Sequence, residues 1–452
     1  MEKNLTIGSV FKNVILFSLP YLLSYFLQTL YGMADLFIIG QFEGVASTTA
    51  VSIGSQVMHM LTVMIVGLAM GTTVSIGQAI GAGDRKQAAK DIGNTVTLFM
   101  AVSIALMAVL LVLVHPIISA MSTPTEAVKG TSAYLTICFI GVPFITAYNI
   151  ISSIFRGMGD SESPMYFIAV ACAANIGLDY LFMGILRLGP AGAALGTTLS
   201  QAVSVAVSLT VILKRKKIVL KEDDFKPYRP VMGKILKIGV PIAFQDGLIQ
   251  IAFIIITIIA NQRGLNDAAA VGIVEKVIGF LFLIPSSMLS TVSALGAQNI
   301  GAGKPERAFQ TLRYAILLTV GFGMLSSIVI QFAVDPVVSL FTDRNAEGGA
   351  DVIQLGGQYL RGYIWDSIFA GIHFSFSGYF CARGKSGLSF LHNILAIALV
   401  RIPGVHLTSQ LFPETLFPMG LATAAGSLTS VVICIIAFTV IRRKDRQLAL
   451  GG

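Results

Sequence analysis

Charged residues are scarce in this chain. Only 12% of its 452 residues are Asp, Glu, Lys or Arg, against roughly 25% in an average soluble protein. Hydrophobic residues make up 55%, which is more apolar surface than a soluble core can bury. Long polar stretches are also lacking, since the one substantial polar segment is 214–235. The composition therefore excludes a soluble globular protein and predicts a membrane protein whose helices face lipid.

Cysteine is rare as well, and its spacing matches no metal or redox motif. The four cysteines lie inside apolar segments without a CxxC pair, at Cys138, Cys172, Cys381 and Cys434. This placement predicts buried thiols that behave as small hydrophobic side chains. The HExxH pattern of zinc proteases and the complete GxxxxGK[ST] pattern of a phosphate loop are absent too. We therefore expect no enzyme activity and no cofactor.

Twelve apolar segments are long enough to cross a bilayer, which requires about 20 residues per helix. They predict an all-α polytopic membrane protein with twelve transmembrane helices. The segments are 14–40, 51–77, 92–115, 131–156, 164–186, 191–213, 236–260, 268–294, 308–332, 352–380, 387–411 and 415–441.

A repeated motif divides these segments into two equivalent halves. The stretch that begins Gln78-Ala-Ile-Gly-Ala-Gly returns 220 residues later as Gln298-Asn-Ile-Gly-Ala-Gly. Each half holds six segments, so both halves enter and leave the membrane on the same side and the repeats are parallel. We expect an N-terminal lobe at 1–213, a basic cytoplasmic linker at 214–235 and a C-terminal lobe at 236–452. The Gly-Ala-Gly turns, 81–83 and 301–303, should end their helices with left-handed backbone.

The net charge of +8 does not indicate a nucleic-acid partner, because its placement follows the membrane. Most of the 31 Lys and Arg residues fall in alternate loops, including the run Lys214–Lys217 in the linker. Cytoplasmic loops carry such an excess, so this bias places both termini in the cytoplasm.

Four carboxylates lie within the apolar segments, where each costs roughly 2.5–3.5 kcal/mol or more and marks a candidate functional site. They are Asp35, Asp179, Glu275 and Asp366. Helix arithmetic puts Asp35, Asp179 and Thr197 at a similar depth, about 8–10 Å below the outer surface. Asn175 shares the helix face of Asp179.

Three interpretations of this oxygen-rich cluster stay open. Burial and mutual repulsion would make one of two neighbouring carboxylates hold a proton near neutral pH. Alternatively, ionised oxygens would bind a hard cation such as sodium. The third interpretation is a structural hydrogen-bond network.

The remaining two acids and one proline are separate candidates. Glu275 is either part of a second polar site or an intramembrane ion pair. Asp366 follows Arg361 near the outer end of its segment, and is either functional or an interface residue. Pro20 interrupts the first segment and is a candidate bending point.

Three further motifs complete a pattern across the whole chain: Phe155-Arg-Gly-x-Gly-Asp160, Asn175-x-x-x-Asp179 and Gly192-Ala-Ala-x-Gly-Thr197. With the two six-helix halves and the repeated turn, the sequence resembles multidrug and toxic compound extrusion (MATE) transporters. It is most similar to the prokaryotic DinF-like branch, in which acidic residues on helices 1 and 5 carry coupling.

The resemblance implies a V-shaped pair of lobes that opens alternately to each side of a bacterial cytoplasmic membrane. A proton or sodium ion moving inward would drive amphipathic, cationic drug-like compounds outward, and a monomer would suffice. The coupling residues implied are Asp35, Asp179, Asn175, Thr197, Tyr134 and Asn149, with bending of helix 1 at Pro20. The alternative is a flippase for a lipid-linked oligosaccharide or a similar amphiphile, which the few basic residues within the segments disfavour.

Overall fold

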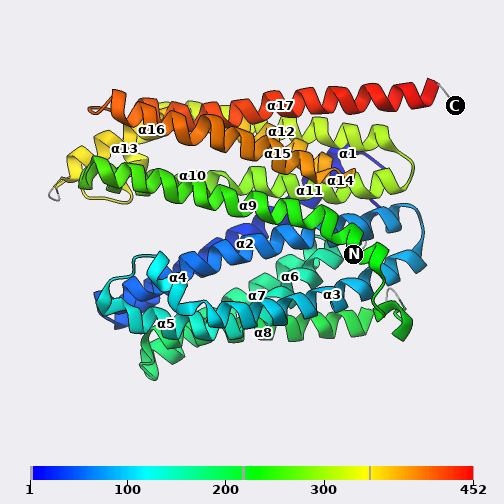
Figure 1. Cartoon of the computed structure of the whole chain (residues 1–452), viewed down its shortest axis with the longest axis horizontal. Coiled ribbons are helices and arrows are strands. Elements are labelled where there is room, and N and C mark those ends of the chain that lie inside the picture. Colours follow the sequence, from blue (N-terminus) through cyan, green and yellow to red (C-terminus); the bar gives the residue numbers. More distant parts are fainter. Residues whose placement is uncertain (1–3, 216–218, 346–347, 451–452) are drawn as a thin grey trace. The chain divides into compact units, whose positions relative to one another are not determined.

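The computed structural model describes residues 4–215, 219–345 and 348–450, and within these ranges the chain is helical, with no β-strand (Figure 1). The predicted fold class is therefore confirmed. The helices of the first half are α1 (Val10–Phe42), α2 (Val45–Gly81), α3 (Arg85–Val112), α4 (Val114–Ala120), α5 (Thr125–Ile140), α6 (Val142–Gly157), α7 (Glu162–Asp179), the π-helix η1 (Tyr180–Ile185) and α8 (Gly189–Arg215). Those that follow are the 3-10 helix η2 (Glu222–Phe225), α9 (Arg229–Arg263), α10 (Leu265–Leu281), α11 (Leu283–Gly301), α12 (Pro305–Ser339), α13 (Gly349–Tyr363), α14 (Asp366–Ala382), α15 (Ser386–Ala396), the π-helix η3 (Ile397–Arg401), α16 (Ile402–Leu411) and α17 (Phe417–Leu450).

Each of the twelve predicted spans is helical, but several are interrupted. Ten helical stretches of the described chain are long and apolar enough to cross a membrane, and the bent pair α5–α6 makes an eleventh. That pair bends by 48° at Gly141, just before Pro143, which has no N–H for the preceding turn. The predicted span 352–380 consists of α13 and α14, of 15 and 17 residues, each shorter than a bilayer requires.

The described chain forms two compact units. The first contains Met1–Ala243 together with Ala297–Lys304, and the second contains Phe244–Gly296 and Pro305–Gly452. In the first unit α7 packs along α8 and α1, while α2 packs against α5 and α6. In the second unit α13 and α14 pack against α17, and α12 packs against α14. Compared with the predicted lobe 1–213, the first unit also contains the linker, residues 236–243 and residues 297–304, the second copy of the repeated turn.

This second copy meets the first copy reciprocally inside the first unit. A Cβ atom added to Gly81 would lie 1.9 Å from the carbonyl oxygen of Gln298, and one added to Gly301 would lie 2.0 Å from the carbonyl oxygen of Gln78. Only glycine allows such backbone approach. Gly83 and Gly303 have φ values of +74° and +69°, so the predicted left-handed turns are confirmed. The repeated sequence is therefore a contact between two copies of one turn.

The predicted linker is ordered over most of its length and lies on α3. Asn94 donates from Nδ2 to the carbonyl of Asp224 over 3.0 Å, and its Oδ1 accepts from the backbone N–H of Tyr228 at 2.7 Å. Thr97 donates to the carbonyl of Phe225. Residues 216–218, which include part of the basic run, lie outside the described ranges. The linker thus holds the start of α9 against the first unit.

Replacing Gly81 by Ala tests the reciprocal turn contact. The added methyl group would collide with the Gln298 carbonyl, and overpacking of this kind costs about 1–3 kcal/mol. We expect the apparent melting temperature of the purified protein to fall by about 2–6 °C. Gly233→Ala in α9 is the matched control, because nothing lies within 4 Å of its added Cβ. Equal melting temperatures for the two variants would contradict the contact.

Candidate functional site

The two predicted coupling carboxylates are both buried in the first unit. Asp35 on α1 is 2% exposed, and Asp179 in the last turn of α7 is fully buried. Asp179 is followed directly by the π-helix η1, and such widened turns occur frequently at functional sites. Asn175, one turn earlier on α7, is also fully buried. The helices α1, α7 and α8 pack on one another, which brings side chains far apart in sequence to one place.

Thr197 connects α8 to the first carboxylate. Its hydroxyl donates to Oδ2 of Asp35 over 3.0 Å and also contacts the carbonyl of Ala193. Asp179 and Asn175 lie within interaction range of the Asp35 carboxyl group as well. The structure therefore brings together four of the six predicted coupling residues.

The polar atoms of this cluster are mostly unsatisfied. Oδ1 of Asp35, both carboxyl oxygens of Asp179 and both polar atoms of the Asn175 amide have no hydrogen-bond partner among the described residues. Two carboxylates cannot donate to each other unless one carries a proton. Buried polar groups without partners are costly, so these atoms distinguish the cluster from an ordinary hydrogen-bond network.

A glycine makes room for the second carboxylate. A Cβ atom on Gly196, which precedes Thr197 on α8, would lie 2.0 Å from Oδ1 of Asp179. The Gly-Thr pair of the motif thus has two distinct roles. The glycine admits one carboxyl group and the threonine bonds the other.

Two polar neighbours of the cluster did not emerge from the sequence. Tyr31 on α1 lies beside Asp35, Thr197 and Gln201. Tyr31 precedes Asp35 by four residues and Gln201 follows Thr197 by four, so the helical repeat places them on the same faces. The four-residue spacing was therefore the sequence signal that could have identified Tyr31 and Gln201. We add both residues to the candidate site.

Tyr134 borders the cluster, within electrostatic range of Asp35 and Tyr31, whereas Asn149 lies apart from it. Tyr134 is buried on α5, and its hydroxyl lies 3.1 Å from that of Ser55 on α2. A Cβ on Gly54 would collide with its ring. Asn149 on α6 donates to the carbonyl of Ile145 in its own helix. Among the described contacts none joins Asn149 to either acid, so it stands apart from the site that the other residues form.

In the second unit Asp366 is part of a buried ion pair. Its Oδ2 accepts from Nη2 of Arg401 over 2.8 Å, and the same nitrogen donates to Ser427. Asp366 is fully buried and Arg401 is 6% exposed. Asp366 is the first residue of α14 and Arg401 is the last residue of η3, so the predicted position of Asp366 near a helix end agrees with the structure. The sequence left open whether Asp366 is functional or an interface residue, and it did not predict the buried ion pair.

Glu275 has one partner and one free oxygen. The Thr257 hydroxyl donates to its Oε2 over 3.2 Å, whereas Oε1 is buried without a partner among the described residues. A fifth carboxylate within the apolar segments, Asp246 on α9, was overlooked in the sequence. The amide nitrogen of Gln245 lies 3.5 Å from its Oδ1.

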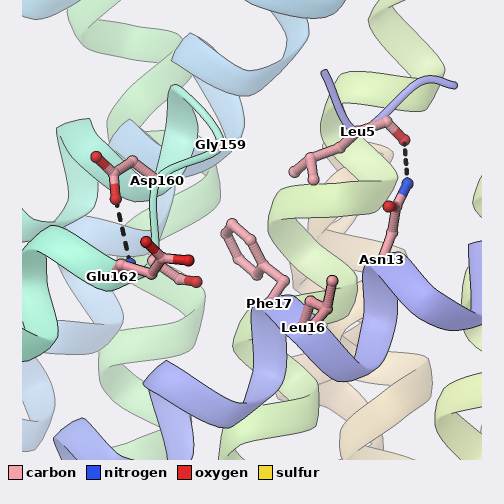
Figure 2. Close-up of a pocket in the computed structure, with 8 residues that line it drawn as sticks. Leu5, Asn13, Leu16, Phe17, Gly159, Asp160 and Glu162 are labelled. Carbon is pink, nitrogen blue, oxygen red and sulfur yellow. Dashed lines mark hydrogen bonds between the residues drawn. The ribbon is translucent and has the colours of Figure 1, made fainter. Parts of the chain in front are cut away.

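The structure offers little support for a metal site or a large cavity elsewhere. Within the described ranges no three His, Cys, Asp or Glu side chains gather closely enough to hold a metal ion. A hard cation between Asp35 and Asp179 would therefore need the oxygens of Thr197 and Asn175 as further ligands. The hollow between the N-terminal segment, α1 and the α6–α7 turn has a volume of about 10 Å³ (Figure 2), room for about one water molecule.

Comparison with known proteins decides the family. The family model described as MatE matches residues 20–181 and 241–407, one segment in each half of the chain. The chain belongs to the MatE family. It is 28% identical over 398 residues to the probable multidrug resistance protein YpnP of Bacillus subtilis, covering 88% of each chain. It is 24% identical to the multidrug export protein MepA of Staphylococcus aureus, covering 90% of this chain and 89% of the relative.

The fold is that of solved MatE-family transporters. An outward-facing multidrug resistance MATE family transporter aligns with a TM-score of 0.89 at 22% identity and covers 98% of each chain. The protein is therefore a multi-pass membrane protein of a multidrug efflux transporter family, and the predicted family is confirmed.

Replacing Gly196 by Ala should disturb the acid cluster without removing a polar group. The methyl group would displace the Asp179 carboxyl, and misplacement of a functional group by about 1 Å can cost 100-fold in rate. We expect at least tenfold slower gradient-driven transport by the reconstituted protein. Gly177→Ala on α7 is the control, since nothing lies within 4 Å of its added Cβ. Wild-type rates for Gly196→Ala would contradict the role assigned to this glycine.

The buried pair Asp366–Arg401 gives a second prediction. Arg401→Met alone leaves Asp366 buried without its cation, which costs about 3–5 kcal/mol. The double variant Asp366→Leu/Arg401→Met removes both charges and should recover most of the lost thermal stability. Melting curves of the three proteins test this. Transport by a stable double variant at wild-type rates would show that the pair is structural, and loss of transport would assign it a functional role.

Proposed function

We propose that this protein is a secondary active antiporter that exports amphipathic organic cations in exchange for inward movement of a proton or a sodium ion by alternating access. The observation that carries the proposal is the group of unsatisfied buried atoms on Asp35, Asp179 and Asn175. An ion that binds there satisfies them and stabilises the packing of α1 against α7 and α8. A drug bound elsewhere must favour the other conformation, since coupling requires different affinities in the two states.

The family membership supports export of small molecules, because relatives such as MepA are named multidrug export proteins. The placement of Lys and Arg supports a cytoplasmic location for both termini. The relatives reported above are bacterial, which supports the bacterial cytoplasmic membrane. We take the monomer as the working unit, because the acid cluster is complete within one chain.

Glu275 and Asp366 receive different roles in this proposal. The free Oε1 of Glu275 makes it a second polar site for a cation or for the substrate. Asp366 is paired with Arg401 through Oδ2, and only its Oδ1 has no hydrogen-bond partner among the described residues. Among the described residues the buried arginines are Arg401 and Arg156, and Arg156 stacks on a tyrosine ring. The scarcity of basic residues within the apolar segments supports the antiporter over a flippase.

The deciding experiment is efflux of a fluorescent cationic dye from proteoliposomes, with a proton gradient and a sodium gradient imposed separately. Transport under one gradient alone establishes the antiport and identifies its ion. Absence of dye movement under both gradients contradicts the proposal, and movement of labelled lipid-linked sugars would then establish the flippase.

Asp35→Asn should abolish gradient-driven efflux while leaving the fold intact. The amide is almost isosteric with the carboxylate but neither releases a proton nor carries a charge, so it cannot cycle with the ion. Dye binding in the absence of a gradient should persist. The control is Asp223→Asn, the same change on an exposed linker residue whose partner is Lys226. Full gradient-driven efflux by Asp35→Asn would refute the coupling role.

A further inference from the structure

Arg156 is a buried cation whose contact is an aromatic ring. It lies in the last turn of α6 and is 8% exposed. Its guanidinium carbon lies 4.1 Å from the centre of the Tyr21 ring. The ion pairs of the described residues do not include Arg156, and its Nε has no hydrogen-bond partner there. A buried charge in a membrane protein is costly, so its position over Tyr21 requires an explanation.

Tyr21 directly follows Pro20, the one proline within α1. Proline cannot donate to the carbonyl of residue 16, so α1 lacks one hydrogen bond at this point. The Ser24 hydroxyl occupies the Pro20 carbonyl over 2.7 Å, and α1 runs unbroken through the proline. The weakest point of α1 therefore lies under the Arg156 guanidinium.

The segment before Pro20 is held by the same region of the chain. The rings of Phe17 and Tyr21 lie 5.7 Å apart, one on each side of Pro20. Phe17 faces the turn that follows α6, where it lines a small hollow with Gly159 and Asp160 (Figure 2). Arg156 and the turn after it thus contact α1 on both sides of its weak point.

This contact controls where Asp35 lies, because α1 acts as a lever. Asp35 is fifteen residues beyond Pro20, which is about 22 Å along a helix. A bend of about 20° at the proline would move it by about 8 Å. That displacement is far greater than the 3.0 Å bond between Thr197 and Asp35 can tolerate. A contact that keeps α1 straight at Pro20 therefore determines whether Asp35 can reach Thr197 and Asp179.

We propose that Arg156 is a positioning residue for ion coupling. Its stacking on Tyr21 holds α1 in the unbroken form that places Asp35 against Thr197 and Asp179. This inference rests on the proposed coupling role of Asp35. A guanidinium over a ring in a desolvated site is well suited to such a hold, and lysine would replace it poorly because it lacks the planar group that stacks.

The test compares Arg156→Gln, Tyr21→Leu and Tyr21→Phe with the parent protein. Tyr21→Phe keeps the ring and should transport normally. Arg156→Gln and Tyr21→Leu remove the contact and should slow gradient-driven turnover by about tenfold or more, with a much smaller change in the KM for the dye. Arg442→Gln is the matched control, since Arg442 also stacks at 4.1 Å, over Phe309, at the partly exposed end of α17.

A second measurement reports the geometry of α1 without relying on transport. Spin labels at Gln41 and Glu126 mark the ends of α1 and α5, and both positions are exposed in the first unit. Pulsed electron paramagnetic resonance should give a narrow distance distribution in the parent and in Tyr21→Phe. It should be broadened or shifted in Arg156→Gln and Tyr21→Leu.

Unchanged distances in both disruptive variants would overturn the inference, as would equal damage from Tyr21→Phe and Tyr21→Leu. If the parent protein transports under neither gradient, the coupling proposal fails. The distance measurements would still decide whether Arg156 holds α1. Should Arg156→Gln fail to fold, the two Tyr21 variants alone separate loss of the ring from loss of the hydroxyl group.

Discussion

The exclusion of water from two facing carboxyl groups is the constraint on which the rest of this structure depends. Asp35 and Asp179 are buried with too few donors around them, in a membrane that offers none. The helices α1, α7 and α8 must approach closely to hold them. Gly196 allows α8 to do so, because a side chain at this position would collide with the Asp179 carboxyl group. The stability of this packing therefore depends on whether a proton or a cation is bound between the carboxyl groups. The proposed coupling requires that dependence, because an ion shifts a conformational equilibrium only if it binds the two conformations with different affinities.

The two units solve the problem of buried charge differently. In the first, the carboxyl groups of Asp35 and Asp179 are neighbours, and no basic side chain pairs with either among the described residues. In the second, Asp366 meets a covalently fixed cation, Arg401, so its charge is permanently compensated. Each unit also carries a π-helix, η1 directly after Asp179 and η3 ending in Arg401.

The sequence was sufficient to predict the features that depend on depth in the bilayer. Helix arithmetic gave Asp35, Asp179 and Thr197 one depth, and the helical repeat added Asn175, because a membrane fixes position along its normal. Lateral partners are set by helix packing, which the sequence does not encode locally. The pairing of Asp366 with Arg401 and the burial of Arg156 were therefore not foreseen. Asn149 is a polar residue of the kind that the site contains. Its helix, α6, is bent by 48° relative to α5 at Gly141, which the sequence did not indicate.

The two Gly-Ala-Gly turns of the repeat cover each other. The turn of the second half belongs to the first compact unit and touches its own duplicate there. Copy one has Asp84, which caps α3, whereas copy two has Lys304, whose ammonium group reaches the Thr6 carbonyl. Each turn covers the backbone of the other, so one half of the chain by itself would leave its turn uncovered. The two copies nevertheless have different second roles, one as a helix cap and the other as a tether for the N-terminal segment.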